Sequence, residues 1–266
     1  MARFSMSQVT TPGWSFERDV EAFAAAGAPG IGISLRKLEA YGVEAAARRL
    51  RDVGLAVSCI AASGRFPLGD DAGEAEAVAR TCRHLAAAAA VGADCLIVLA
   101  GANPALSWEE AAARVRPLLE RLVPAAERAG VRLALEPTSQ LRMDLGFVHS
   151  FDEALDLVDA VDSPWLGVVL ELNNAWIERR LAENIRTRTA QIALVQISDF
   201  KVGTFTAGDR VVIGDGDIPL RRICATLAGA GYAGWWDIEL LGPAIEAEGY
   251  DAVVPRAIDR FRALWT

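Results

Sequence analysis

The sequence predicts an α/β protein, a single (β/α)8 TIM barrel that spans residues 1–266. Three observations support this fold class. Short apolar runs alternate with amphipathic or alanine-rich helical stretches along the whole chain. A glycine often stands just before an apolar run, where a left-handed residue would end the preceding helix. No GxGxxG phosphate turn follows the first run, although an open doubly wound sheet would normally carry one there.

Eight apolar runs are predicted strands, which is the number that a closed parallel barrel of this length needs. They cover residues 3–8, 30–34, 56–62, 94–99, 132–136, 166–171, 192–198 and 235–240. The predicted helices cover residues 16–26, 43–53, 74–91, 108–129, 151–161, 177–189, 220–230 and 253–264. The expected helix-ending glycines are Gly27, Gly54, Gly92, Gly130 and Gly231.

The longest irregular stretch runs from Asp199 to Pro219, directly after the seventh predicted strand. Loops of this length in a compact domain are usually functional or disordered. Because this loop follows the carboxyl end of a strand, we expect it to cover the functional site.

The composition excludes some classes of partner. The formal net charge of -8 and a pI near 5.0 oppose the positive field that nucleic-acid binding requires. The longest apolar stretch, Leu85 to Ala100, is interrupted by Gly92 and Asp94, so no membrane span is expected.

The cysteines are scattered without a metal-binding or disulfide spacing, which favours buried free thiols. The first residues lack the apolar core of a secretory signal. A cytoplasmic location is therefore expected.

Four predicted strands end on an oxygen-bearing side chain: Glu136, Glu171, Gln196 and Glu239. Carboxyl ends of parallel barrel strands meet at one rim, so these four groups should lie together. Three carboxylates in a partly dry pocket would repel one another, and a divalent cation would relieve that repulsion. Oxygen donors favour Mg²⁺ or Mn²⁺ over zinc. The sequence thus predicts a metal enzyme.

Alternation along the strands predicts one further pair. Arg132 shares the face of Glu136, and Asp237 shares the face of Glu239, so both would be buried charges. We expect them to form a salt bridge lower in the barrel. Of the two histidines, His84 is expected to be a surface or packing residue, whereas His149 precedes a helix and lies either at the active rim or at the start of that helix.

The motifs around these strand ends resemble the xylose isomerase-like barrels, a family of sugar phosphate isomerases and epimerases. The resemblance covers the whole chain, and its most specific parts are LALEPTS, GVVLELNNAW, VQISD and GDGDIP with GYAGWWDIELLG. It implies that Glu136, Glu171, Gln196 and Glu239 are metal ligands and that Glu136 and Glu239 form the acid/base pair. Asp199, directly after the seventh predicted strand, either orients Gln196 or caps the loop that follows, and the resemblance favours a role behind Gln196.

Two positions depart from the family pattern. Glu171 stands where aspartate is usual, and Asn174 stands where many epimerases place a substrate-contacting histidine. Gln196 resembles the hydroxypyruvate isomerase and dehydroshikimate dehydratase branches.

The expected reaction is proton abstraction next to the carbonyl of a sugar or polyhydroxy ketone, through a metal-stabilised enediolate. If a beta substituent leaves before reprotonation, the same groups would make a dehydratase or lyase, including one that cleaves C-glycosides with a partner subunit. The sequence leaves these alternatives open, and it also leaves a homo-oligomer open.

Other polar and aromatic residues follow the same strands. Lys201, Arg210 and Arg142 are candidates to hold substrate hydroxyls or a phosphate, and Trp14 and Trp176 are candidates to wall the pocket. A DNA-repair endonuclease of related fold would need a histidine-rich metal site and a basic face, and the chain offers neither.

Overall fold

Eight parallel strands close into one barrel in sequence order, and the eighth pairs with the first. The strands of this computed structural model, which describes residues 2–204, 206 and 208–265, are β1 Arg3–Ser7, β2 Gly30–Ser34, β3 Ala56–Gly64, β4 Ala93–Leu99, β5 Arg132–Leu135, β6 Leu166–Glu171, β7 Ile192–Ile197 and β8 Trp235–Ile238. The predicted fold class is confirmed.

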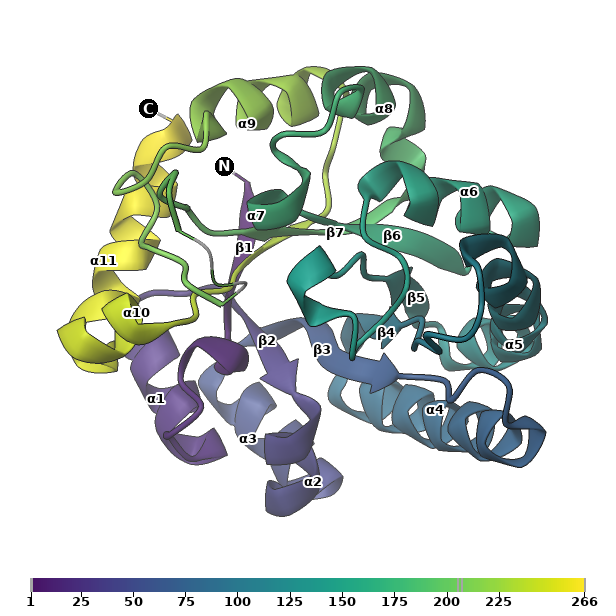
Figure 1. The fold of residues 1–266 in the computed structure, drawn as a ribbon. Coiled ribbons are helices and arrows are strands. Elements are labelled where there is room, and N and C mark those ends of the chain that lie inside the picture. Colours follow the sequence, from purple (N-terminus) through teal and green to yellow (C-terminus); the bar gives the residue numbers. More distant parts are fainter. Residues whose placement is uncertain (1, 205, 207, 266) are drawn as a thin grey trace.

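Helices surround the barrel, as Figure 1 shows. They are α1 Phe16–Ala25, α2 Leu35–Tyr41, α3 Val43–Val53, α4 Asp71–Val91, α5 Trp108–Ala129, α6 Phe151–Val161, α7 Leu172–Ala175, α8 Leu181–Arg188, α9 Leu220–Gly229, α10 Pro243–Glu248 and α11 Tyr250–Arg262. Short 3-10 turns follow β1 (Gln8–Thr10) and β5 (Gln140–Arg142), precede β7 (Thr189–Gln191) and end the described chain (Ala263–Trp265).

Local sequence signals set most helix boundaries. Ser107 with Glu110 and Ser150 with Glu153 form capping boxes that begin α5 and α6. All five glycines expected to end helices have positive φ, between 64° and 81°. In that left-handed region glycine lacks the steric cost that a Cβ would bring, so the chain turns there toward the next strand.

The core consists of two parts. Cys59, Cys95, Ile97, Val169 and Leu194 belong to a small cluster of buried side chains from several strands, which fills the barrel. A larger apolar layer packs between the strands and the helices. Among the described residues, no helix is long and apolar enough to cross a membrane.

One predicted helix is shorter than expected. The helix expected over residues 177–189 is α8, at residues 181–188, and a separate short helix, α7, begins directly at the end of β6, where Glu171 caps it. The short helices α2 and α10 were not expected. α10 lies between Gly242 and Gly249, both of which have positive φ, and is too short to show a clear helical period.

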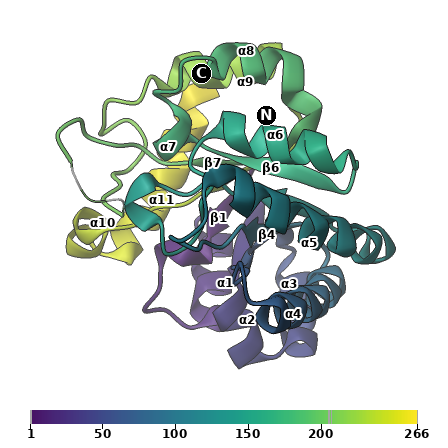
Figure 2. The same ribbon diagram turned by 45° about the vertical axis from the view of Figure 1, so that its right-hand side comes forward.

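The loop between β7 and α9 carries no helix or strand in its described part, as expected, and residues 205 and 207 lie outside the description. An isolated bridge pairs Asp199 with Val211. Figure 2 shows the loop extending beyond the barrel on the side of α7 and α10. Its position above the strand ends lets it contribute to the site.

Candidate active site

The four predicted strand-end residues lie at the carboxyl end of the barrel. Glu171 closes β6 and is paired in register with Gln196 of β7. Glu136 directly follows β5 and Glu239 directly follows β8. Glu136 and Glu239 line one cavity of about 260 Å³, together with Arg210 from the long loop. Three neighbouring parts of the fold therefore bring charged groups to one pocket.

Glu239 is held on both of its carboxylate oxygens. The side-chain amide of Gln196 donates to Oε1 at 3.0 Å, and Nη1 of Arg210 donates to Oε2 at 2.6 Å. Nη1 also donates to the backbone carbonyl of Glu239 at 2.9 Å. Charge-assisted bonds of this kind are strong and fix the orientation of the carboxylate.

Arg210 is buried, with 6% of its surface exposed. Its Nη1 also lies 3.7 Å from Oε1 of Glu171, so one guanidinium contacts two of the predicted ligands. Burial alone would lower the pKa of Arg210, but the negative charges of Glu171, Glu239 and Glu136 outweigh burial and raise it. The arginine thus supplies positive charge where the sequence predicted a metal.

Glu171 also caps the helix α7. Its two carboxylate oxygens accept hydrogen bonds from the backbone N–H groups of Asn173, at 3.0 Å, and Asn174, at 3.1 Å. These groups form the first turn of α7, so Glu171 is its N-cap. Burial raises the pKa of Glu171, while Arg210 and the two N–H groups oppose that shift.

The pKa of Glu136 is also shifted by its surroundings. Burial, followed by the charges of Glu239 and Glu171, raises its pKa to about 8, and Arg210 opposes the shift. A carboxyl group with this pKa is largely protonated at neutral pH. Glu136 can therefore donate a proton while Glu239 is paired with a cation.

The site suits a divalent ion by its chemistry but not by its present spacing. All four candidate donors are oxygens, and Oε1 of Gln196 is buried without a hydrogen-bond partner. However, within the described residues no three His, Cys, Asp or Glu side chains are arranged to hold a metal. The cause is visible in the contacts: Arg210 lies against Glu239, and Glu171 is turned toward α7. A bound ion would have to replace the arginine contact.

Several predicted substrate-binding residues do reach a cavity. Asn174 lines both the pocket of Glu136 and Glu239 and a neighbouring cavity, which Trp176 and His149 also line. His149 is oriented by a 3.0 Å hydrogen bond between Nδ1 and the carbonyl oxygen of Thr138. Arg142 lines the pocket of the two glutamates and is paired with Asp144.

Other predicted residues lie elsewhere. Trp14 packs edge to face against Tyr250 and under Arg18, away from both cavities. Lys201 is exposed on the loop. Asp199 does not contact Gln196: its carboxylate accepts hydrogen bonds from the backbone of the loop itself, at residues 200, 214 and 218.

The predicted salt bridge between Arg132 and Asp237 is wrong. Arg132 donates to the carbonyl oxygens of Leu166 and Ala190, and Asp237 accepts a 2.6 Å hydrogen bond from Ser5. Arg132 thus bonds to the main chain at the amino ends of β6 and β7. Asp237 bonds instead to a side chain of β1. Burial raises the pKa of Asp237 to about 7, and its hydrogen bond to Ser5 opposes that shift. His84 is a packing residue, as expected, and its Nδ1 lies 2.7 Å from Oγ of Ser63.

Sequence reasoning missed several residues that line the neighbouring cavity: Ser139, Gln140, Asn173, Glu178 and Phe200. Only their position in the sequence could have indicated these residues, since each lies in a segment that follows β5, β6 or β7. It also missed the ion pair of Arg210 with Glu239, because that contact depends on how the long loop folds.

Fold and site together define a barrel that gathers acidic side chains at the carboxyl ends of β5, β6 and β8. The chain belongs to the xylose isomerase-like TIM barrel family, which it matches over residues 20–263. No curated protein matches it.

Solved structures share this fold. Protein SMc04130 from Sinorhizobium meliloti 1021 is 27% identical, with a TM-score of 0.92 and 98% of each chain covered. IolI protein, solved with a zinc atom, is 19% identical, with a TM-score of 0.87 over 98% of this chain and 97% of that one. D-psicose 3-epimerase, solved in the presence of D-fructose, is 18% identical, with a TM-score of 0.81 over 98% of this chain and 99% of that one. Below 25% identity the likeness concerns the fold.

Proposed function

We propose that this protein is an isomerase or epimerase that acts on a sugar or related polyhydroxy ketone by moving a proton next to the carbonyl group. The observation that carries the proposal is the pair Glu136 and Glu239 on one pocket, with Arg210 between Glu239 and Glu171. The family and the epimerases among its structural neighbours support the same class of reaction.

The two glutamates divide the acid and base roles through their surroundings. Glu239, paired with Arg210 and oriented by Gln196, accepts the proton next to the carbonyl. Glu136, whose pKa is raised to about 8, returns a proton to the neighbouring carbon or to the opposite face. Such acid/base help typically contributes about 10²- to 10⁴-fold to the rate.

Arg210 has a further donor for the substrate. Its Nε is buried without a hydrogen-bond partner among the described residues. A donor held in a buried site stabilises an oxygen on which negative charge develops. We therefore assign Arg210 to the carbonyl oxygen of the substrate.

The oxygen donors also suit Mn²⁺ or Mg²⁺. The residues that would hold the ion are Glu136, Glu171, Gln196 and Glu239, and the unpartnered Oε1 of Gln196 is the observation that favours it. Such an ion would polarise the substrate carbonyl as a Lewis acid. Because Arg210 contacts two of these residues, ion and guanidinium compete for the same carboxylates.

The test is proton exchange in deuterated water, with keto sugars, inososes and dehydroshikimate as candidate substrates and mass spectrometry as the readout. Wild-type protein should place deuterium on carbon in at least one compound. Glu239→Gln and Glu136→Gln should each lower that exchange by about 100-fold or more, whereas Glu76→Gln, at an exposed surface position, should not change it.

The proposal is contradicted if no compound exchanges with the wild-type protein, with or without added Mn²⁺. It is also contradicted if both glutamine variants exchange as fast as wild type. Loss of a beta substituent together with exchange would instead assign the dehydratase or lyase reaction to the same pair.

A further inference from the structure

A second cavity, of about 390 Å³, adjoins the catalytic pocket. Ser139 and Asn174 line both, so the two spaces share a wall at these residues. The catalytic pocket alone, at about 260 Å³, is small for a ligand site, since such sites typically measure about 300–1,000 Å³. A substrate that reacts at Glu136 and Glu239 can therefore extend into the second cavity.

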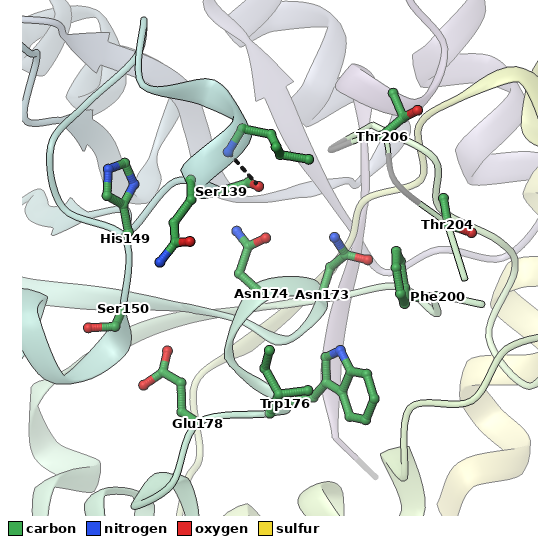
Figure 3. A pocket seen from close by; sticks show the side chains of 13 residues that line it. Ser139, His149, Ser150, Asn173, Asn174, Trp176, Glu178, Phe200, Thr204 and Thr206 are labelled. Atoms are coloured by element: carbon green, nitrogen blue, oxygen red, sulfur yellow. Dashed lines mark hydrogen bonds between the residues drawn. The ribbon is translucent and has the colours of Figure 1, made fainter. Parts of the chain in front are cut away.

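Aromatic and aliphatic side chains form one side of this second cavity. Figure 3 shows Trp176 and Phe200 on one side, His149 and Ser150 on the opposite side, and Asn173 and Asn174 between them. Both rings are partly buried against the core, so their positions are supported by packing. Such a wall suits the face of an aromatic ring.

The rim of the cavity is also apolar. Among the described residues, the exposed large hydrophobic side chains are Leu141 at 64%, Met143 at 60%, Ile177 at 71% and Val202 at 68%. All lie in the segments that follow β5, β6 and β7, and Leu141 and Ile177 line the cavity directly. Scattered exposed hydrophobics need no explanation, but Leu141 and Ile177 open onto one cavity, and exposed apolar side chains gathered at a cavity mark a binding site.

One polar atom in this wall lacks a partner. Oδ1 of Asn173 is buried without a hydrogen bond, although the backbone N–H of the same residue is held by Glu171. A buried acceptor of this kind favours a ligand that brings a donor, because an unpaired polar atom costs stability. A phenolic hydroxyl group is such a donor.

We propose that the second cavity binds a hydroxylated aromatic ring attached to the substrate, which would make the substrate an aryl glycoside in its keto form rather than a free sugar. This inference rests on the proposed function for the reacting end of the molecule. It adds Trp176, Ile177 and Asn173 as the residues that determine specificity.

The test uses binding alone, so that it does not depend on turnover. Calorimetry would compare 4-hydroxyphenyl, phenyl and methyl β-D-glucoside, which carry a hydroxyl group in place of the keto group and therefore bind without reacting. Wild-type protein should bind the 4-hydroxyphenyl compound about tenfold more tightly than the methyl compound, because a stacked ring contributes on that order. The affinity for the phenyl compound should lie between the other two affinities.

Variants identify the side chains responsible. Trp176→Ala should abolish the preference for the aryl compounds. Trp165→Ala, which removes a partly buried tryptophan at the start of β6, should keep the preference. Ile177→Ser, at a 71% exposed position that leaves the fold intact, should reduce the preference. Asn173→Leu should make the phenyl and 4-hydroxyphenyl compounds bind equally.

Equal binding of all three glucosides by the wild-type protein would overturn the proposal, and so would an unchanged preference in Trp176→Ala and Ile177→Ser. If Ile177→Ser instead changes the oligomeric state in light scattering, the rim is a protein interface and the aryl assignment is wrong. Exchange of free keto sugars by Trp176→Ala at the wild-type rate would leave the proposed function intact in either case.

Discussion

Two cationic side chains are buried near the carboxyl end of the barrel, and their surroundings differ. Lys37 of α2 has one carboxylate partner, Asp19, at 2.5 Å, and it also donates to the carbonyl oxygen of Thr11 at 2.7 Å. Arg210 faces Glu239 and Glu171, with Glu136 nearby. The charge of Lys37 is balanced by one carboxylate, whereas Arg210 faces more carboxylate groups than its single charge can balance.

The difference separates a pair with a structural role from the group that we propose to be functional. Asp19 also accepts a 2.7 Å hydrogen bond from Thr11, so the lysine pair leaves little for a ligand to satisfy. Burial raises the pKa of Asp19 and lowers that of Lys37, and their mutual hydrogen bond opposes both shifts. Around Arg210, excess negative charge and unpartnered atoms on Gln196 and Arg210 remain. Those are features that a substrate or ion can use.

The largest effect is expected at the lysine. Lys37→Met leaves the carboxylate of Asp19 buried without a charged partner, and breaking a buried pair in this way costs about 3–5 kcal/mol of unfolding free energy. Urea unfolding followed by circular dichroism would measure it. The exchange activity of the folded fraction should stay at the wild-type level. A selective loss of activity would mean that Lys37, like Arg210, takes part in the reaction.

A comparable loss is expected at the arginine, in activity rather than stability. Arg210→Gln removes a preorganised donor from the substrate oxygen and from Glu239, and such losses typically reduce turnover by about 10²- to 10³-fold. The deuterium exchange assay would report it. An Arg210→Gln protein that exchanges at the wild-type rate would show that this arginine, like Lys37, is structural.

A third prediction concerns metal affinity. Because Arg210 competes with an ion for Glu239 and Glu171, Arg210→Gln should bind Mn²⁺ more tightly than wild type. A neighbouring charge changes the proton affinity of a carboxylate by about 10- to 1,000-fold, and the gain for Mn²⁺ should be at least tenfold by the same effect. Calorimetric titration measures this directly, with Lys37→Met as the matched control. Weaker Mn²⁺ binding by Arg210→Gln would mean that the arginine assists the ion.

The smallest effect is expected for a cation on the surface. Arg83 pairs with Glu76 at 2.9 Å, but both side chains are more than 60% exposed. Arg83→Gln should change the unfolding free energy by less than about 1 kcal/mol and leave exchange unchanged. A larger effect in the same urea experiment would show that burial is not what distinguishes the three cations.

Much of the fold could be predicted because local signals repeat along the chain. Apolar runs placed all eight strands, and the glycines with positive φ marked the ends of helices. The strand-end rule brought Glu136, Gln196 and Glu239 to one end of the barrel, since it follows from topology rather than from side-chain detail.

The contacts within the site could not be predicted in this way. Glu171 accepts hydrogen bonds from the N–H groups of α7, and the sequence pattern did not show that helix because it has only four residues. The position of Arg210 depends on the path of a long loop with no repeating pattern. Arg132 bonds to main-chain oxygens at the amino ends of β6 and β7, whereas Asp237 bonds to Ser5, and alternation along a strand cannot reveal which partner a side chain reaches.

The carboxylate of Asp199 has a consequence for how this barrel can change. A single side chain bonds to the backbone at residues 200, 214 and 218, so the two ends of the long loop are fastened at one point. The segment between them carries Arg210, which bonds outside the loop to Glu239 and Leu241. Exchanging this segment between related barrels, with Asp199, Glu239 and Leu241 kept, offers a route to new substrate ranges without redesigning the strands beneath it.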